Sequence, residues 1–451
     1  MSRYHVAVAS LALLGTTAGV VPAFAQQEAK AKSIWQQETL TGDWGGERTS
    51  LKNNGIDIDI TLIDEVFSVL SGGVRREASY EGQLGFTVDA DLAKLIGWTG
   101  ATTHVTVFDI RDSGRNVIQN TGSISDPSNI DALPTVRLYD AWYQQAFGDR
   151  LTIRLGQILA DGEFMTAPST AGLINGTFGW DGLLGANMLN GGPAYPLAVP
   201  GAMVEANLSD AVKLKSALFA GNPAGSGCAK QPQECDLYGT TFSSAGGALV
   251  MSELQYAVNQ GKDAVGLPGT YKIGGWFATA KFNDLRSGIT ASGVTVLLGT
   301  NPAASPIQRS GNGGLYAVAD QTVWRESGRS LSLFLRGGIA PPDRNLVSYY
   351  IDGGTALKGP FDERPDDVLS FGVAYARISP DASAADRDAS AVVRDYEAVF
   401  ELDYSARITP WWTVQPDVQY IIHPNGGQNP DDPTQRIGNA FVTGLRSTVK
   451  F

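Results

Sequence analysis

The residues best suited to chemistry in this sequence are carboxylates and arginines, because the chain has only three histidines and two cysteines. It contains no Gly-x-Ser-x-Gly, Gly-x-Gly-x-x-Gly or His-Glu-x-x-His motif and no phosphate-binding loop. Enzymes that depend on those motifs are therefore disfavoured. Acidic pairs such as Asp57 with Asp59 and Asp366 with Asp367 leave a glycosidase open, since that reaction needs only two carboxyl groups.

Many of these charged residues alternate with apolar ones. From Ile56 to Leu62 every even position is apolar and every odd position polar, and similar patterns return at residues 80–91, 400–407, 412–423 and 441–451. A β-strand points successive side chains to opposite faces, so each segment predicts a strand with one apolar and one polar face. A single such strand would also suit a soluble sandwich, but the repetition favours a large β-structure.

The composition of the chain limits which molecules it can bind or transport. The formal net charge of -12 argues against nucleic acid and against a channel that gathers anions. The 53 glycines, together with clusters of Asn, Asp and Pro, fit a chain with many tight turns. No cofactor or metal is expected.

The first residues have the features of a secretory signal peptide. Arg3 and His5 precede an apolar run at residues 6–21, and Ala23-Phe24-Ala25 supplies a small-x-small cleavage pattern. We expect cleavage after Ala25, a periplasmic N-terminal segment at 26–55 with a short helix, and a β-barrel at 56–451. The length after cleavage would suit roughly two or three globular domains, or one barrel of about 16 strands.

An exported protein that has no membrane-spanning helix is either a soluble secreted protein or an outer-membrane barrel. No later stretch has 18 consecutive apolar residues. Lysine is sparse on the polar faces, and aromatic residues such as Tyr139, Tyr143 and Trp412 stand near strand ends, as at membrane interfaces. An aromatic last residue, here Phe451, is typical of outer-membrane barrels and is a signal for their assembly machinery. An all-β transmembrane antiparallel barrel in the bacterial outer membrane is therefore predicted, with outer-membrane lipid around it.

Several motifs together resemble the carbohydrate-selective porins of the OprB family. They are Leu40-Thr41-Gly42-Asp43-Trp44-Gly45-Gly46-Glu47-Arg48-Thr49, Leu138-Tyr139-Asp140-Ala141-Trp142-Tyr143-Gln144-Gln145, Arg154-Leu155-Gly156-Gln157, Glu163-Phe164, Lys272-Ile273-Gly274-Gly275-Trp276-Phe277 and, most strongly, the segment 397–427. The resemblance spans about residues 39–451. It implies a 16-stranded barrel, monomeric or trimeric, that passes glucose and related sugars or polyols. One departure is Asp140, where the resemblance implies a glutamate.

Alternation nominates the residues that would line the channel. The nominated wall residues are Glu65, Asp109, Arg111, Asp140, Trp142, Arg154, Glu401, Asp417 and Arg446. The Gly-rich segment 161–190 is expected to fold into the pore as its constriction and to bring Asp161, Glu163 and Phe164 with it. The polar stretches 112–133 and 341–367 are expected to be extracellular loops.

Cys228 and Cys235 lie in a polar stretch with Pro232, which predicts one disulfide across a loop of an exported protein. Three alternatives to a sugar channel remain at this point. They are a general diffusion porin or channel for another small solute, a barrel-type hydrolase, and a soluble carbohydrate-binding sandwich.

Overall fold

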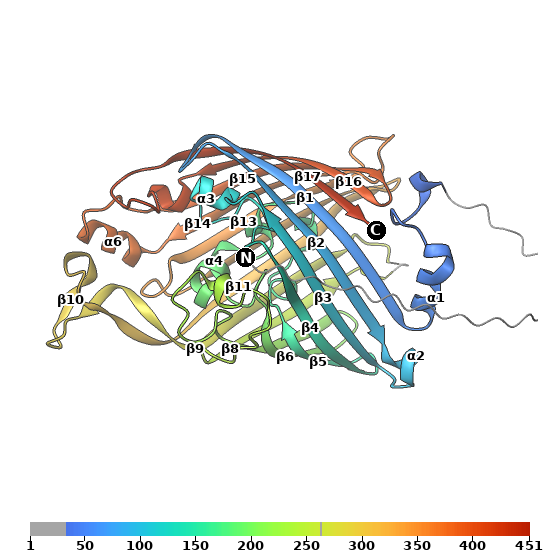
Figure 1. Ribbon diagram of the computed structural model, residues 1–451, viewed down its shortest axis with the longest axis horizontal. Helices are drawn as coiled ribbons and strands as arrows, with labels where there is room; N and C mark the ends of the chain where they lie inside the picture. The colour runs from blue at the N-terminus through green and yellow to red at the C-terminus, as the bar shows by residue number, and fades with distance from the viewer. Residues whose placement is uncertain (1–32, 262–263) are drawn as a thin grey trace, which may run out of the picture.

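The computed structural model describes residues 33–261 and 264–451 (Figure 1). The signal peptide predicted at residues 1–25 and the start of the predicted segment 26–55 lie outside the described residues. Among the helices in the described part of the chain, none is long and apolar enough to cross a membrane.

The described residues form a closed antiparallel β-barrel of sixteen long strands, with one short extra strand in a loop. The long strands are β1 Ile56–Gly73, β2 Ala78–Asp91, β3 Ala101–Asp112, β4 Thr135–Phe147, β5 Leu151–Ile158, β6 Val199–Asn207, β7 Val212–Ala220, β8 Ala248–Val258, β9 Gly269–Ile289, β11 Ser305–Glu326, β12 Arg329–Ile339, β13 Val347–Lys358, β14 Val368–Ile378, β15 Tyr396–Thr409, β16 Trp412–Ile422 and β17 Gly438–Lys450; β10 is Thr295–Leu297. The predicted architecture is confirmed.

The barrel closes at β1, which pairs with β2 on one side and with β17 on the other. Glu65 lies opposite Glu81 in the first pairing and opposite Arg446 in the second. Each other long strand pairs with its sequence neighbours, and β9 pairs directly with β11 across the β10 loop. Among the sixteen long strands that the structure describes, closure leaves none with an unpaired edge, which a hydrocarbon environment would not tolerate.

Helices and 3-10 turns occupy the connections between strands. The helices are α1 Glu47–Asn53, α2 Leu92–Ile96, α3 Val117–Thr121, α4 Gly182–Asn187, α5 Pro232–Cys235 and α6 Pro380–Asp388, and the 3-10 turns are η1 Ile34–Gln36, η2 Trp44–Gly46, η3 Pro168–Thr170, η4 Gly176–Phe178, η5 Leu189–Gly191, η6 Leu298–Thr300 and η7 Pro424–Gly427. A disulfide joins Cys228 to Cys235 in the connection between β7 and β8, as predicted.

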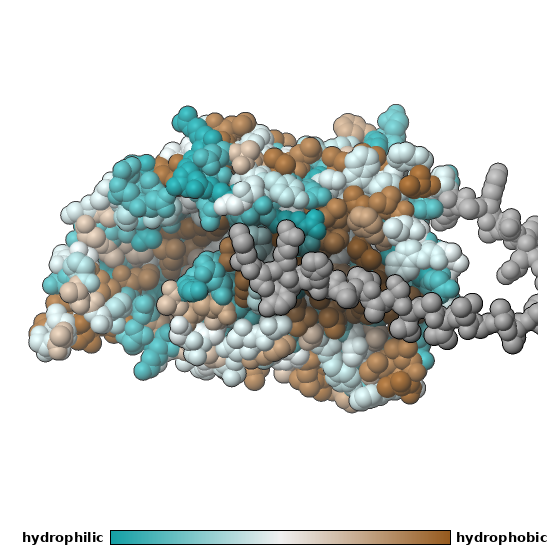
Figure 2. Space-filling model, viewed as in Figure 1, coloured by the Kyte–Doolittle hydropathy of each residue, from teal (hydrophilic) through white to brown (hydrophobic). Residues whose placement is uncertain are grey.

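The barrel is polar inside and apolar outside. On β15, Leu402 is 47% exposed on the outer surface while its neighbours Glu401 and Asp403 are buried inside. Figure 2 shows apolar side chains on the visible outer surface over the strands. A water-soluble protein would not expose such side chains along most of its strands, whereas hydrocarbon solvates them without penalty.

The short N-terminal helix is present as predicted, and it lies at the rim beside the start of β1 (Figure 1). Arg48 fixes it there: its Nη2 donates to the carbonyl oxygens of Ile58 at 3.2 Å and Phe451 at 2.5 Å. Gly55 follows the helix at φ +100°, and a Cβ there would lie 2.8 Å from the carbonyl oxygen of Asp91, so only glycine fits this turn.

Connections differ between the two ends of the barrel. Short turns such as residues 148–150 and 208–211 lie at the end that carries α1 and α2, while long connections lie at the other end. Short turns mark the periplasmic end of outer-membrane barrels. The stretch 341–367, expected to be one extracellular loop, instead contains β13, because Val347, Tyr350 and their neighbours pair with β12 and β14.

Candidate functional site

Two long connections fold into the barrel instead of standing above it. We call residues 159–198, between β5 and β6, the inner loop, and residues 113–134, between β3 and β4, the second loop. The loops join each other where the Gly176 N–H donates to the Asp126 carbonyl oxygen at 2.8 Å. The segment 161–190 that was expected to enter the pore lies within the inner loop.

Carboxylates from the barrel wall hold the backbone of the inner loop. Glu253 on β8 accepts from the N–H of Met165 at 2.8 Å, and Asp320 on β11 accepts from the N–H of Ser169 at 2.8 Å. Charge-assisted bonds to backbone N–H groups are among the stronger protein hydrogen bonds. The loop is therefore fixed to the far side of the barrel and narrows the lumen.

Arg336 on β12 is the most extensive of these anchors. Its side chain is fully buried, and its Nη2 lies 2.5 Å from the Asp352 carboxylate on β13. The same guanidinium donates to three loop carbonyl oxygens, those of Met165 at 3.0 Å, Thr177 at 3.0 Å and Gly179 at 3.2 Å. One cation thus satisfies acceptors in both the wall and the loop.

The second loop is held by the same type of contact. Glu397 on β15 accepts from the N–H groups of Ile124 and Ser125 at 2.7 Å each. Glu65 on β1 pairs with Arg446 on β17 at 2.5 Å and accepts from the hydroxyl of Ser128. These contacts explain why so many charged side chains are buried inside the barrel.

An open polar cluster remains on the wall formed by β3, β4 and β5. The Trp142 ring stacks on His104 at 4.7 Å with an interplanar angle of 7°, and the Arg154 guanidinium lies 4.2 Å from the Trp142 ring centre. His104 comes from β3 and Arg154 from β5, on either side of β4, so they cover opposite faces of the indole. Asp140 accepts from the Trp142 Nε1 at 3.2 Å.

The covered indole changes what this cluster can offer a solute. Glu163 of the inner loop bridges Arg154 at 2.6 Å and Lys215 on β7 at 2.5 Å. Because both faces of Trp142 are occupied, its ring cannot stack on an apolar solute face without displacing a neighbour. The cluster therefore presents carboxylate, guanidinium and amide groups to the lumen as hydrogen-bonding partners.

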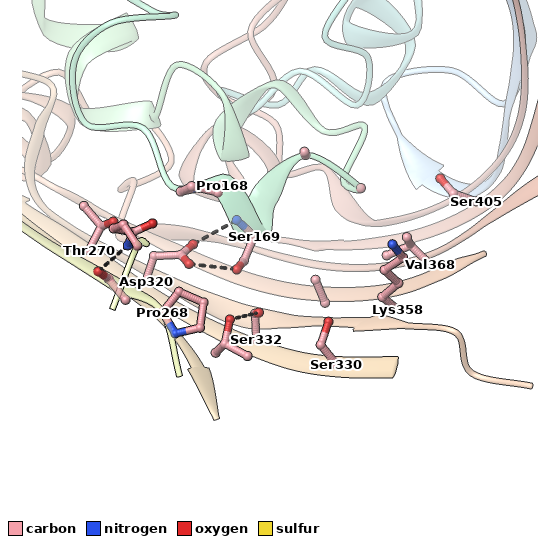
Figure 3. Close-up of a pocket in the computed structure, with 16 residues that line it drawn as sticks. Pro168, Ser169, Pro268, Thr270, Asp320, Ser330, Ser332, Lys358, Val368 and Ser405 are labelled. Carbon is pink, nitrogen blue, oxygen red and sulfur yellow. Dashed lines mark hydrogen bonds between the residues drawn. The ribbon is translucent and has the colours of Figure 1, made fainter. Parts of the chain in front are cut away.

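Two cavities flank the inner loop. The first, of about 450 Å³, lies at the periplasmic half and is lined by hydroxyl groups of Ser169, Thr322, Ser330, Ser332 and Ser405 and by Asp320 and Lys358 (Figure 3). The second, of about 460 Å³, lies between the inner and second loops and is lined by Asp126, Asp131, Asp161, Asp181, Tyr139, Trp180 and Tyr195, among others. Both volumes are within the range of small-molecule sites.

The acids of the second cavity are closely surrounded by protein atoms, and Asp181 is fully buried. Burial raises the pKa of Asp131 to about 7, and Asn116 donates a hydrogen bond that opposes the rise. Burial also raises the pKa of Asp161 to about 6 and that of Asp181 to about 6. At neutral pH these groups carry negative charge only at a cost, and they make the second cavity unfavourable for anions.

The nominated wall residues fall into three groups. Asp140, Trp142, Arg154 and Glu163 meet in the open cluster, and Asp161 lines the second cavity. Glu65, Phe164, Glu401, Asp417 and Arg446 do point inward but are buried, with at most 8% exposure, so the expectation that they contact the lumen is wrong. The reason is that the two loops cover them.

The third group, Asp109 and Arg111, is on the outer face, contrary to expectation. They bond to each other at 2.5 Å and lie opposite Leu84 and Gly82 on β2. Directly paired residues share a face, and Leu84 belongs to the apolar outer face. Phe108, next to Asp109, points inward, and its ring centre lies 6.1 Å from that of Tyr195 in the inner loop.

Sequence reasoning missed Arg336, Asp352 and Tyr350, the principal anchors of the inner loop. A signal was present: Arg336 stands between Leu335 and Gly337 in an apolar strand, and Asp352 follows Ile351 in the next strand. Alternation alone places both side chains inside. What it does not show is that the two residues pair, because strand register is not visible in the sequence.

Comparisons with known proteins agree with this geometry. The profile described as "Carbohydrate-selective porin, OprB family" matches residues 75–451. Porin B of Pseudomonas aeruginosa is 27% identical over 97% of this chain and 95% of its own length, and the putative porin QuiX of Acinetobacter baylyi is 24% identical over 93% and 95%. The high-pH structure of Pseudomonas putida OprB superposes with a TM-score of 0.78 at 25% identity, covering 93% of this chain and all of that one.

The family match covers most of the chain, the structural match covers 93% of it, and the inner loop and polar wall have the form of a channel. The chain belongs to the OprB family of carbohydrate-selective porins and is an outer-membrane channel, not an enzyme.

Proposed function

We propose that this porin passes monosaccharides such as glucose, and related polyols, by passive diffusion along the open polar cluster and the two cavities. The observation that carries the proposal is the lining of the cavities. Most of the polar side chains that line both cavities carry hydroxyl or carboxylate groups, and Lys358 is the one cationic residue among their described lining residues. Such a lining hydrogen-bonds a neutral polyhydroxyl solute and disfavours anions.

The open cluster suits weak, reversible contact with a sugar. Asp140 and Glu163 offer acceptors to hydroxyl groups, and Arg154 offers donors in a fixed plane. Their side chains are only 13% to 20% exposed, so a passing solute meets one edge of each group. Diffusion through a channel needs contacts that are favourable on entry and weak enough for exit.

Solute flux into proteoliposomes tests the proposal. Arg154→Ala and Asp140→Ala should each alter the ratio of glucose flux to ion flux. Asp109→Ala is the matched control, because it removes a charged residue that lies outside the lumen. The proposal fails if both cluster variants keep the wild-type ratio. Rates that follow solute size alone would support a general diffusion porin.

We also propose that Phe451 is read by the barrel assembly machinery. In the folded barrel its N–H donates to the Ile60 carbonyl oxygen at 2.8 Å, and its own carbonyl oxygen accepts from Arg48. The residue is thus occupied once folding is complete and free for recognition only before closure. Whether the mature channel is a monomer or a homotrimer is addressed by its mass in mild detergent.

A further inference from the structure

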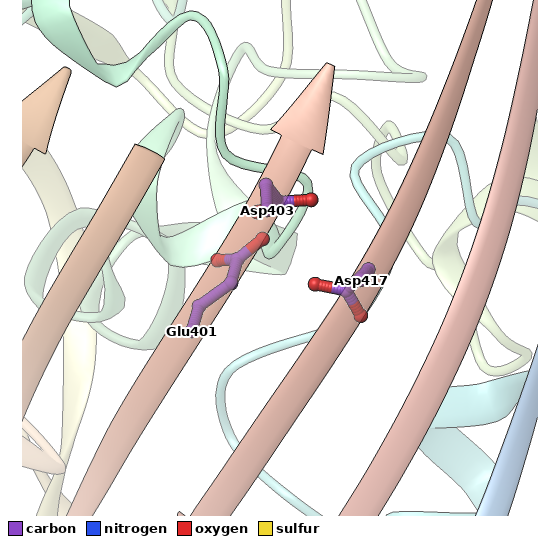
Figure 4. A group of neighbouring side chains, drawn as sticks. All are labelled: Glu401, Asp403 and Asp417. Carbon is purple, nitrogen blue, oxygen red and sulfur yellow. The ribbon is translucent and has the colours of Figure 1, made fainter. Parts of the chain in front are cut away.

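Three carboxylates converge beneath the inner loop. Glu401 and Asp403 stand two positions apart on β15, so they share the inward face, and Asp417 on β16 lies directly opposite Asp403 (Figure 4). One oxygen from each of the three lies within 4.8 Å of the others. All three side chains are buried, with exposures of 1% to 2%.

Each carboxylate has one oxygen that accepts from an N–H donor and a second oxygen that no donor group reaches. Glu401 Oε1 accepts from the Asn175 N–H at 2.9 Å, Asp403 Oδ1 accepts from Gln415 at 2.9 Å, and Asp417 Oδ1 accepts from Gln419 at 3.1 Å. Glu401 Oε2, Asp403 Oδ2 and Asp417 Oδ2 are buried, and no donor group among the described residues bonds to them. Glu401 and Asp403 lie close enough to bond to each other, but only through a shared proton. An unpaired buried acceptor is costly, and a buried unpaired charge more so.

A fourth oxygen, from a residue outside the acidic cluster, has the same property. Ser370 on β14 lies opposite Asp403, so its side chain shares the inward face, and it is fully buried with no partner for its Oγ within the described chain. Gly172 of the inner loop lies over it so closely that an added Cβ would come 2.1 Å from that Oγ. Four buried oxygens that no donor group reaches thus lie on the inward faces of β14, β15 and β16, beneath the inner loop.

The neighbouring cation offsets only part of this negative charge: Arg446 attracts both Asp403 and Asp417, but its hydrogen bonds go to other residues. Arg446 donates to Glu65 at 2.5 Å and to Asn129 at 2.7 Å, so its guanidinium is engaged on its other side. Three carboxylates in a dry site need either protons or a bound cation to offset their mutual repulsion. The donor set decides which cation fits: all four atoms are oxygen, which selects a hard metal ion.

We propose that Glu401, Asp403 and Asp417, with Ser370, bind a calcium ion that fixes the inner loop to the barrel wall. Calcium is favoured over magnesium because magnesium gives up its water reluctantly and this site excludes water. The ion links wall to loop through groups already bonded to both. Glu401 accepts from the loop N–H groups of Ile174 and Asn175, and Gln415 bridges Asp403 to the Gly172 carbonyl oxygen.

The test uses the full-length mature protein refolded into detergent free of lipopolysaccharide, which otherwise carries divalent cations. The protein is equilibrated with millimolar calcium chloride and desalted, and its metal content is measured by mass spectrometry. The wild type should retain about one calcium ion per chain. The triple variant Glu401→Gln, Asp403→Asn, Asp417→Asn should retain none. Asp366→Asn, which removes an exposed carboxylate at the β13–β14 turn, is the control and should retain the ion.

Thermal unfolding supplies an independent readout. EDTA should lower the midpoint of the wild type and of the control and leave the neutral triple variant unchanged. Asp417→Asn alone serves as a second variant should the triple variant fail to fold, and it should weaken retention of calcium. The proposal is overturned if the wild type retains no calcium, if the variants retain as much as the wild type, or if the wild-type midpoint responds to pH but not to calcium or EDTA.

Discussion

Replacing Arg336 by methionine should release the inner loop from the wall of the barrel. The substitution keeps much of the side-chain volume but removes a fully buried guanidinium. It leaves the Asp352 carboxylate with Tyr350 at 2.8 Å as its remaining side-chain partner. It also removes the guanidinium donor from the loop carbonyl oxygens of Met165, Gly179 and Thr177, of which Thr177 keeps the Tyr350 hydroxyl at 3.2 Å.

The size of the effect follows from these lost partners. Removing one member of a buried ion pair costs about 3–5 kcal/mol, mostly because the other charge stays buried. Each freed carbonyl could add about 1–3 kcal/mol, but water entering beside the detached loop would satisfy it, so the terms do not add. We expect a loss of about 3–5 kcal/mol. Arg336→Met with Asp352→Leu should lose less, because no unpaired charge remains.

Two measurements report this change. Denaturant titration of the refolded barrel gives the free energy of unfolding, and single-channel recording gives the conductance, which should rise as the loop leaves the lumen. Arg329→Met, at the start of the same strand, is the control. Arg329 forms an ion pair with Asp362, and the two side chains are 35% and 84% exposed, respectively. The loss in free energy of unfolding should therefore stay below about 1 kcal/mol. A wild-type free energy and conductance for Arg336→Met would refute the role assigned to this arginine.

Two further predictions concern the outer face and the buried acids. Leu402→Lys, at the middle of β15 on the outer face, should cost about 2–4 kcal/mol of barrel stability, the cost of a lysine at the bilayer midplane. Ser405→Lys, which enters the first cavity, should be tolerated, and equal losses would contradict the assigned faces. Burial raises the pKa of Asp181 to about 6 from an ordinary 3.8, so folding favours the protonated carboxyl group. Its contribution to the free energy of unfolding is therefore complete below about pH 4 and is lost as pH rises through 6. Asp181→Asn keeps the cap on the N–H groups of Leu183 and Leu184. It should therefore be more stable than the wild type at pH 7.5, by at most about 3 kcal/mol, and equal to it at pH 4; an unchanged pH dependence of the thermal midpoint would show that Asp181 does not titrate in this range.

The sequence predicts the barrel well because alternation records a local property, the face to which each side chain points. Leu402 and Asp403 show this: the first is on the outer surface and the second is inside. Asp109 and Arg111 show where the prediction fails. Like Val105 and Val107 on the outer face, they occupy odd-numbered positions of β3, so alternation places them outside. Their assignment to the lumen rests on their charge. Both residues lie in the last four positions of β3, and charged residues cost little on the outer surface of a barrel near the membrane interface.

The location of the channel lining could not be predicted in the same way, because it depends on what covers the wall. Glu65 and Asp140 are both inward-facing acids on strands, yet the first is 2% exposed under the second loop and the second belongs to the open cluster. Alternation treats them alike, since the path of a long loop is set by contacts far apart in sequence. Glu253, Asp320, Arg336 and Glu397 supply those contacts from four strands. The charged residues of this barrel therefore serve two purposes, and most of the buried ones determine the shape of the pore by fixing loops and do not contact the solute.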